Sequence, residues 1–301
     1  MPRTITVGFD GSLESRAAAE WAAREAALRA LPVKLVQVWQ PVPEPMAQAS
    51  LLDAETHQHW TERIPREFAE GLRSRHPGIE VTIEQRFGGP AEALVKVAKD
   101  ADMLVLGSRG LGGIGGFLVG SVGLGVVAHT ERPVVLVRAG EQAADEHERD
   151  DAGIPSASTA FRPVVLGLDV AGPDDALLEF AFEAAARRSA PLRVVHGWNP
   201  PPYYVYGMAL EPAVEQETAK GDAVVLSEVL RPWRQKYPDV EVVEQSHNGS
   251  PAVLLVGASH DASLVVVGRR IRRFPAGAHI GTVTHAVLHH ATAPVAVVAH
   301  D

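Results

Sequence analysis

The sequence predicts an α/β protein made of two tandem doubly wound domains, each a five-stranded parallel sheet with helices on both faces. Three observations predict this class. The chain repeats itself, since the segment that begins at residue 4 returns at residue 163. In each copy, short β-branched runs alternate with longer alanine-rich stretches, as strands alternate with helices in α/β proteins. The strand segments are continuous apolar runs, which are typical of parallel sheets covered on both faces.

The repeat keeps its spacing along the chain. Asp10 returns as Asp169, 159 residues later, and Gly107 returns as Gly268, 161 residues later. So steady an offset indicates a duplicated domain. We therefore expect a first domain, a linker and a second domain: residues 1–139, 140–160 and 161–301. The linker is rich in Asp and Glu, so we expect it to be solvated and mobile.

In the first copy, each expected strand is a short β-branched or apolar run: residues 4–8, 33–39, 81–86, 103–107 and 133–138. Each expected helix is a longer stretch between two of them: residues 15–28, 54–75, 91–100 and 121–128. Right-handed crossovers then join five parallel strands in a Rossmann-like arrangement. Proline-rich segments at 41–50 and 199–208 follow the second strand of each copy. We interpret them as connecting loops, with a functional lid as the alternative.

Composition excludes several function classes. The chain has 301 residues, of which 46% are apolar and 22% charged, as in globular proteins. Its net charge of -9 argues against sequence-independent binding to nucleic acid, which needs a basic surface. The chain has no cysteine, which excludes disulfides, thiol catalysis and thiolate metal sites.

Two further features bear on location. Residues 111–130 carry no charged side chain, but seven of them are glycines, which weaken a lone apolar helix. We therefore expect neither a membrane span nor a membrane partner. The chain opens directly into a strand pattern, so we expect no signal peptide and a cytoplasmic location.

The strongest local pattern follows the fourth strand. Gly107 ends that strand, Arg109 and Gly110 lie in the loop beyond it, and nine residues later Gly120 and Ser121 open a helix. Glycines let backbone N–H groups approach a phosphate, and a helix N-terminus offers free N–H groups and a positive dipole end. Ser121 either caps the helix or donates its hydroxyl to a phosphate. The alternative is a glycine loop that serves turns alone.

A second strand-to-helix turn, Gly8-Phe9-Asp10-Gly11-Ser12, places Asp10 at the carboxyl edge of the first strand, within reach of a sugar or base. With these residues the chain resembles the universal stress protein family, once over 4–138 and again over 162–300. The pattern Gly-x2-Gly-x9-Gly-Ser/Thr after the fourth strand, with an Asp after the first, is similar to that family's ATP-binding signature.

The resemblance implies a role for each matching residue of the first copy. Gly8, Phe9 and Asp10 would flank the adenosine, Val38 would meet the adenine edge through its backbone, and Gly107 would lie near the ribose. The residues expected to hold the phosphates are Arg109, Gly110, Gly120, Ser121 and Val122. Mg²⁺ would accompany the phosphates. The family also pairs domains through their last strands, here residues 134–137 and 295–298.

The second copy keeps part of the pattern. Its matching residues, which we predict as binding residues of a second site, are Asp169, Gly268, Gly281 and Thr282. The second glycine is replaced by Ile271, which tolerates positive φ poorly and crowds the backbone. Four arginines surround Ile271, and they either grip phosphates or form a solvated basic loop. We expect this site to be weaker, more salt-sensitive or empty.

Three patterns imitate other sites. Residues 110–115 match a dinucleotide fingerprint but follow a late strand. Residues 259–261 read Ser-His-Asp, but adjacent residues cannot form a catalytic triad. His285 and His289 lie four residues apart, yet no third metal ligand is evident, so we favour surface histidines.

The sequence marks no catalytic base or nucleophile. The leading hypothesis is therefore a nucleotide-dependent signalling protein of the stress response that binds ATP. The alternatives are a slow ATPase or related nucleotide-processing enzyme, and a partner-binding protein with vestigial sites. A homodimer is an open alternative, because no residue pattern decides it, and the protein partner is unknown.

Overall fold

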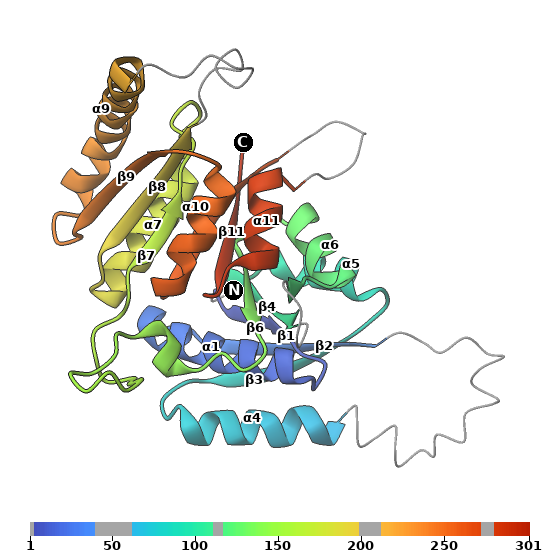
Figure 1. Cartoon of the computed structure of the whole chain (residues 1–301). Coiled ribbons are helices and arrows are strands. Elements are labelled where there is room, and N and C mark those ends of the chain that lie inside the picture. Colours follow the sequence, from blue (N-terminus) through green and yellow to red (C-terminus); the bar gives the residue numbers. More distant parts are fainter. Residues whose placement is uncertain (1–2, 40–61, 111–116, 199–211, 272–279) are drawn as a thin grey trace. The chain divides into compact units, whose positions relative to one another are not determined.

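The structure, a computed structural model, describes residues 3–39, 62–110, 117–198, 212–271 and 280–301. The chain divides into two compact units, unit 1 (Met1–Ala143) and unit 2 (Ala144–Asp301). Figure 1 shows the elements of both, coloured along the sequence.

Unit 1 contains a five-stranded parallel sheet, as the sequence predicts. Its strands are β1 (Ile5–Gly8), β2 (Val33–Trp39), β3 (Val81–Phe87), β4 (Met103–Gly110) and β6 (Val134–Arg138). They lie in the order β3-β2-β1-β4-β6, and each neighbouring pair is parallel. The chain turns from one half of the sheet to the other between β1 and β4, where open α/β sheets bind ligands.

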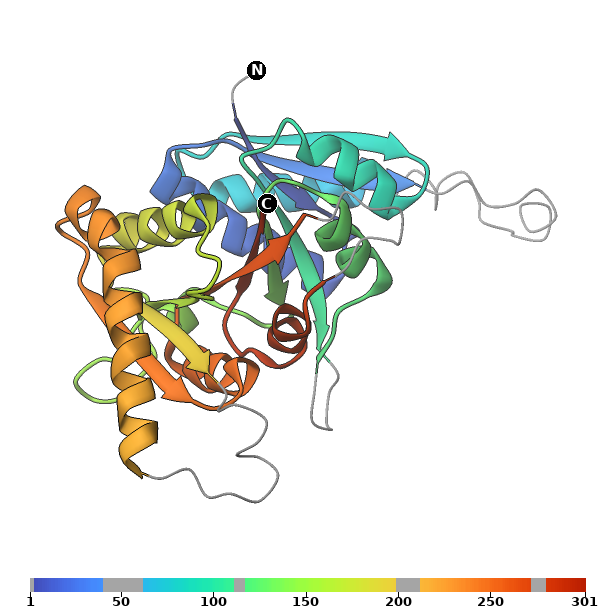
Figure 2. The ribbon, with the colours of Figure 1, turned by 90° about the horizontal axis from the view of Figure 1, so that it is seen from above.

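Helices cover both faces of this sheet. The described ones are α1 (Leu13–Arg29), α4 (Ile64–Arg75), α5 (Pro90–Ala98) and α6 (Ser121–His129). Helices α1 and α4 lie on one face, and α5 and α6 lie on the other (Figures 1 and 2). This arrangement brings the starts of α1 and α6 to the carboxyl ends of the central strands.

Of the expected helix 54–75, residues 54–61 lie outside the described residues, as do both proline-rich segments. Strand β4 does not end at Gly107 but continues to Gly110, because its last two residues pair with a short antiparallel strand, β5 (Phe117–Leu118). Arg109 and Gly110 therefore lie in a strand, and their placement in a loop was wrong.

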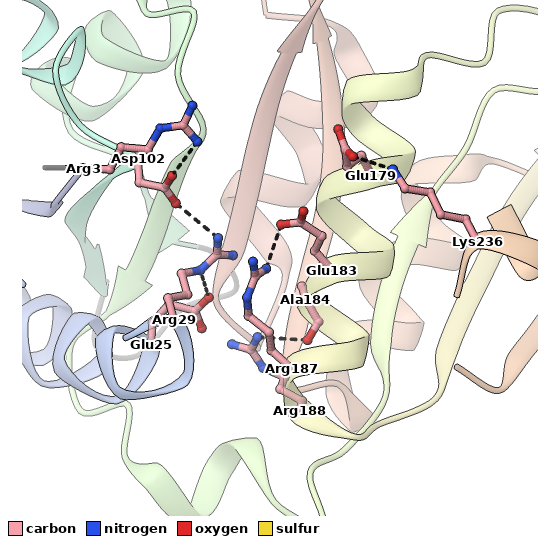
Figure 3. A network of polar contacts seen from close by, with 10 residues as sticks. All are labelled: Arg3, Glu25, Arg29, Asp102, Glu179, Glu183, Ala184, Arg187, Arg188 and Lys236. Atoms are coloured by element: carbon pink, nitrogen blue, oxygen red, sulfur yellow. Dashed lines mark hydrogen bonds and ion pairs between the residues drawn. The ribbon is translucent and has the colours of Figure 1, made fainter. Parts of the chain in front are cut away.

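Helix α1 carries a buried ion pair. Glu25 is 1% exposed, and its carboxylate accepts a hydrogen bond of 2.5 Å from Nε of Arg29. Nη1 of Arg29 also donates to Asp102 at 3.2 Å, and Arg3 lies 3.5 Å from the same carboxylate (Figure 3). These contacts tie α1 to the start of β4.

Unit 2 repeats the architecture. Its strands are β7 (Val164–Gly167), β8 (Leu192–Trp198), β9 (Val242–Asn248), β10 (Leu264–Arg270) and β11 (Val295–His300). They lie in the order β9-β8-β7-β10-β11, all parallel. The described helices are α7 (Asp175–Arg188), α9 (Pro212–Lys236), α10 (Pro251–Ala258) and α11 (Thr282–His290). The predicted fold class is confirmed in both units.

Helix α7 lacks the buried ion pair of its counterpart α1. Ala184 stands where the repeat places Glu25, and Arg188, at the position of Arg29, donates to the carbonyl of Ala184 at 3.3 Å (Figure 3). The second copy therefore has no carboxylate at the position of Glu25 in its own helix.

Much of the expected linker is folded within unit 2. After a 3₁₀ turn (Ala143–Glu146), His147 pairs with Phe161 and Arg149 with Pro155 in a small hairpin. Glu146 is 2% exposed, and the ring of His147 lies 4.0 Å from that of Phe161. The expectation of a solvated segment is therefore wrong for Glu146 and His147, whereas Arg149 and Pro155 are exposed.

No helix in the described part of the chain combines the length and the apolar composition needed to cross a membrane.

Candidate functional site

A cavity of about 290 Å³ opens at the carboxyl ends of the central strands of unit 1. Small-molecule pockets typically measure roughly 300–1,000 Å³, so this cavity lies at the lower end of the range. It brings together eight of the ten residues predicted for the first copy: Gly8, Phe9, Asp10, Val38, Gly107, Gly120, Ser121 and Val122. The other two, Arg109 and Gly110, belong to the end of β4, where the side chains lie outside the description.

The turn between β1 and α1 fixes Asp10. Gly11 has a φ of +81°, which glycine adopts without strain. The turn aims the backbone N–H and the hydroxyl of Ser12 at Oδ1 of Asp10, at 3.0 and 2.5 Å. Ser12 is also the N-cap of α1, because its Oγ accepts the N–H of Ser15 at 3.2 Å. The start of α1 therefore orients the carboxylate at the rim of the cavity.

The Asp10 carboxyl is ionised at neutral pH. Burial acts to raise its pKa, but the hydrogen bonds from Ser12 and Ser15 outweigh burial and hold the pKa below its ordinary value of 3.8. An ionised carboxylate accepts hydrogen bonds only, so Asp10 suits the hydroxyl groups of a ligand.

Two of the predicted glycines have a packing role. A Cβ on Gly107 would lie 2.4 Å from the backbone carbonyl carbon of Glu14, because the first turn of α1 crosses the end of β4. A Cβ on Gly8 would lie 2.6 Å from Cδ2 of Leu106. These glycines let the elements around the cavity approach one another closely.

Phe9 lines the cavity, but its ring belongs to the core. The side chain stacks on Phe68 of α4 with ring centroids 4.9 Å apart, and Phe9 is 2% exposed. We therefore expect the backbone of Phe9, and not its ring, to face a ligand.

The N-terminus of α6 opens onto the cavity. Gly120 is its N-cap, and no described side chain caps the first-turn N–H groups. A Cβ on Gly120 would meet nothing within 4 Å. Ser121 is the first residue of the helix and not its cap, and it is exposed. The free amides and the helix dipole make this end of the cavity suitable for an anion.

Three polar residues of the cavity were not predicted: Ser12, Glu14 and Ser15. Ser12 could have been predicted from the sequence, since a serine just before an alanine-rich stretch is a typical N-cap. Nothing in the sequence identifies Glu14, because it reaches the cavity only where α1 crosses over β4.

Unit 2 has a cavity of about 400 Å³ in the corresponding place. Asp169, Gly268 and Gly281 line it, as predicted. Thr282 is not among its lining residues; instead Thr284 lines it, with its hydroxyl donating to the carbonyl of Gly268 at 2.7 Å.

Ile271 does not have a left-handed backbone conformation. Its N–H donates to the carbonyl of His300 at 2.6 Å and continues the ladder between β10 and β11. Among the described residues, only Ala30 and Ser189 combine a side chain with positive φ. The position therefore carries no left-handed strain, but its amide is engaged in the sheet. Residues 272–273, which hold two of the four arginines, lie outside the description.

Cationic side chains distinguish the second cavity. Arg269, 5% exposed, and Arg270 both line it, and the Arg270 guanidinium lies 4.0 Å from the Asp169 carboxylate. His196 and His300 also line it and were not predicted. His300 ends β11, which lies beside β10, and His196 belongs to β8, which lies beside β7.

The histidine pair on α11 is close together. The ring centroids of His285 and His289 lie 4.4 Å apart. Burial, followed by the charge of His289, lowers the pKa of His285. The described residues contain no group of three or more side chains that could hold a metal ion.

The sequence matches known proteins along its length. The model of the universal stress protein family matches residues 1–138 and 160–299. A universal stress protein of Mycolicibacterium smegmatis is 34% identical over 304 residues, covering 98% of this chain and 96% of the relative. Universal stress protein Rv2005c of Mycobacterium tuberculosis is 34% identical over 300 residues, covering 97% and 96%.

The fold also matches a solved structure. The crystal structure of a universal stress protein from Archaeoglobus fulgidus superposes with a TM-score of 0.70 and covers 99% of this chain and 98% of that one. The two sequences are 18% identical, so the match concerns the fold alone.

Proposed function

Because the chain belongs to the universal stress protein family, we propose that it binds ATP in the cavity of unit 1 and acts as a nucleotide-dependent regulator in the stress response. The adenosine lies beside Asp10 and the backbone of Val38. The phosphates lie at the start of α6, and Mg²⁺ accompanies them as a counterion.

One observation carries the proposal. The uncapped N-terminus of α6 and the ionised carboxylate of Asp10 border the same cavity. The first offers amides to phosphate, and the second offers acceptors to ribose hydroxyls. Gly120 leaves open space between them. A carboxylate at the rim would repel a bare anion, whereas it would accept hydrogen bonds from the hydroxyl groups of a nucleotide.

Substitution of Gly120 by Asp tests the site. Asp is a good N-cap, and a side chain at Gly120 meets no neighbour, so Gly120→Asp should fold normally. Its carboxylate would occupy the first-turn amides and repel phosphate. We expect calorimetry to show at least a roughly tenfold loss of ATP affinity. This is the effect of losing about one charge-assisted hydrogen bond.

The matched control is Gly281→Asp in unit 2. Gly281 is likewise the N-cap of its helix with open space around it. The Gly281→Asp variant should leave the affinity of the tighter ATP site, that of unit 1, unchanged. Unchanged tight binding in Gly120→Asp would rule out the start of α6 as the phosphate site. Mass spectrometry of any nucleotide released from the purified protein identifies the natural ligand.

The alternative activity is slow ATP hydrolysis. The carboxylates of Asp10 and Glu14 both border the cavity and are the only described acidic groups there that could orient a water. Phosphate release from ATP and Mg²⁺, lost in Glu14→Gln, would favour an enzyme. Binding without turnover supports the regulatory role. If no nucleotide raises the melting temperature, a partner-binding protein with vestigial sites is the better hypothesis.

The organisation of the chain is part of the proposal. We propose domains over 1–139 and 161–301, with the acidic linker 140–160 between them, and a cytoplasmic location.

The apolar strands β6 and β11 would pair with one another, because each otherwise leaves an open edge. A crystal structure with these two strands apart and facing solvent would contradict the pairing.

A further inference from the structure

Strand β3 forms the edge of the unit 1 sheet farthest from β6. It pairs with β2 over its whole length, from Val81 to Phe87. No other strand in the described part of the chain pairs with it. Two of its side chains are apolar and exposed, Ile83 at 37% and Phe87 at 79%. An edge of this kind is a template for another strand.

The register fixes which backbone groups point outward. Glu80 accepts from Val33 and Gly88 donates to Trp39, so the even-numbered residues between them turn their N–H and C=O groups toward β2. The odd-numbered residues of β3 therefore turn theirs away from β2. These are Val81, Ile83, Gln85 and Phe87.

We propose that β3 pairs with β3 of a second copy of this chain, antiparallel, with the two-fold axis at Gln85. Residue 85 then faces residue 85, and Ile83 faces Phe87 of the second copy. All of these residues have outward-facing backbone groups, so they form the hydrogen-bonded pairs of the new ladder. The contact is independent of nucleotide and leaves β6 free.

The side chains are self-complementary in this register. Each exposed apolar residue meets the other, Ile83 against Phe87. Glu84 meets Arg86 of the second copy in a non-hydrogen-bonded pair, where side chains are closest. Within one chain, Glu84 already pairs with Lys34 at 3.1 Å and with Arg86. The second copy thus extends an existing charge network, and the two-fold symmetry repeats both the Ile83–Phe87 and the Glu84–Arg86 contact.

The second repeat supplies the contrast. At the corresponding positions of β9, Glu244, Ser246 and Asn248 replace Ile83, Gln85 and Phe87, while Gln245 and His247 replace the charged pair. The same register on β9 would join no apolar side chains and no opposite charges. One edge per chain is therefore self-complementary, which closes a dimer and does not build a filament.

The lack of cysteine makes the register testable in the full chain. Hydrogen-bonded antiparallel pairs have Cα atoms about 5.5 Å apart, within the span of a disulfide. Gln85→Cys should therefore give mostly disulfide-linked dimer on a non-reducing gel after mild oxidation. Ser246→Cys, at the matching place on β9, should stay monomeric. Equal yields from the two variants, or no dimer from Gln85→Cys, would overturn the proposal.

Charge reversal tests it without cysteine. Glu84→Arg and Arg86→Glu each place like charges together twice, so each should weaken self-association roughly tenfold by sedimentation velocity. The double variant restores opposite charges and should recover the dimer. Melting temperatures report whether the variants fold. A monomeric unmodified chain at all concentrations, a dimer indifferent to either reversal, or a double variant as weak as the singles would contradict the β3 contact.

Discussion

Single residues of the cavity serve folding and binding in different proportions. Gly107 and Gly120 both belong to the glycine pattern after the fourth strand. The backbone of Glu14 lies where a Cβ of Gly107 would be, while Gly120 faces open space. The first is therefore a packing glycine, and the second keeps room for a ligand.

The same substitution should separate these roles. Gly107→Ser overpacks the contact between α1 and β4, and we expect it to lower the free energy of unfolding by about 1–3 kcal/mol or more. Gly120→Ser supplies a favourable N-cap and should not lower it. It should weaken ATP binding, because its hydroxyl occupies an amide of α6. Urea unfolding and calorimetry measure both effects. Equal stability of the two variants would contradict the packing role of Gly107.

The titration of Asp10 depends on Ser12. The pKa of Asp10 is lowered, so its hydrogen bonds stabilise the fold above the ordinary pKa and are lost as the pH falls through the folded value. Ser12→Ala removes the hydroxyl donor and should raise the pKa of Asp10 toward 3.8. Ser12→Thr keeps the hydroxyl and serves as the control. Carboxyl NMR titration measures the shift, and an unchanged pKa in Ser12→Ala would assign the lowering to another group.

At the scale of elements, the two copies hold their first helix differently. Helix α1 uses the buried pair of Glu25 and Arg29, with Asp102 as a further partner, whereas Arg188 of α7 bonds the carbonyl of Ala184 (Figure 3). A buried charge that loses its partner is costly, so we expect the Glu25–Arg29 pair to contribute more to stability than the half-exposed Glu183–Arg187 pair of α7.

Removal of one charge tests this dependence. Glu25→Gln leaves the Arg29 guanidinium, whose side chain is 6% exposed, without its nearest carboxylate. Because Asp102 remains as a partner of Arg29, we expect a loss of about 1.5–3 kcal/mol in the free energy of unfolding. Glu183→Gln breaks an i,i+4 pair of α7 that is 36% and 32% exposed, and should change it by at most about 1 kcal/mol. Thermal and urea unfolding compare the two variants. Similar losses in the free energy of unfolding would contradict a greater contribution from the buried pair.

At the scale of the molecule, duplication has produced two unlike cavities. The described lining of the first includes the carboxylates of Asp10 and Glu14 and no cationic side chain. The second includes Arg269 and Arg270, and the amide of Ile271 is engaged in the sheet. Both cavities border an uncapped helix N-terminus, and only the second adds described cationic side chains to it.

This difference predicts unequal sites. Asp10→Ala leaves the second site to be measured, and Asp169→Ala leaves the first. We expect ATP to bind the second site roughly 10–100-fold more weakly, since one or more charge-assisted hydrogen bonds are missing. Its affinity should also fall more steeply with salt, because Arg270 is exposed and screened. Calorimetry at two salt concentrations measures both. Equal affinities with equal salt dependence would show that the replacement at Ile271 is neutral.

The sequence by itself determined the duplication, the fold class and the place of Asp10 and Gly120. These follow from local patterns: strand and helix periods, turn residues, and a spacing that parallel sheets bring to one edge. The apolar runs and the glycine pattern can both be recognised without knowing any contact between distant segments, so the sequence alone is enough to identify them.

Only the tertiary structure decided why Gly107 is glycine, why Glu14 borders the cavity, and how Ile271 is accommodated. Each depends on an approach between segments far apart in the chain: α1 over β4, and β11 beside β10. The exposed, self-complementary edge of β3 is likewise invisible in the sequence, because burial depends on which strands find neighbours. The sequence alone determines features that depend on local spacing, such as the turns and the glycine pattern. Features that depend on packing between distant segments are determined only by the tertiary structure.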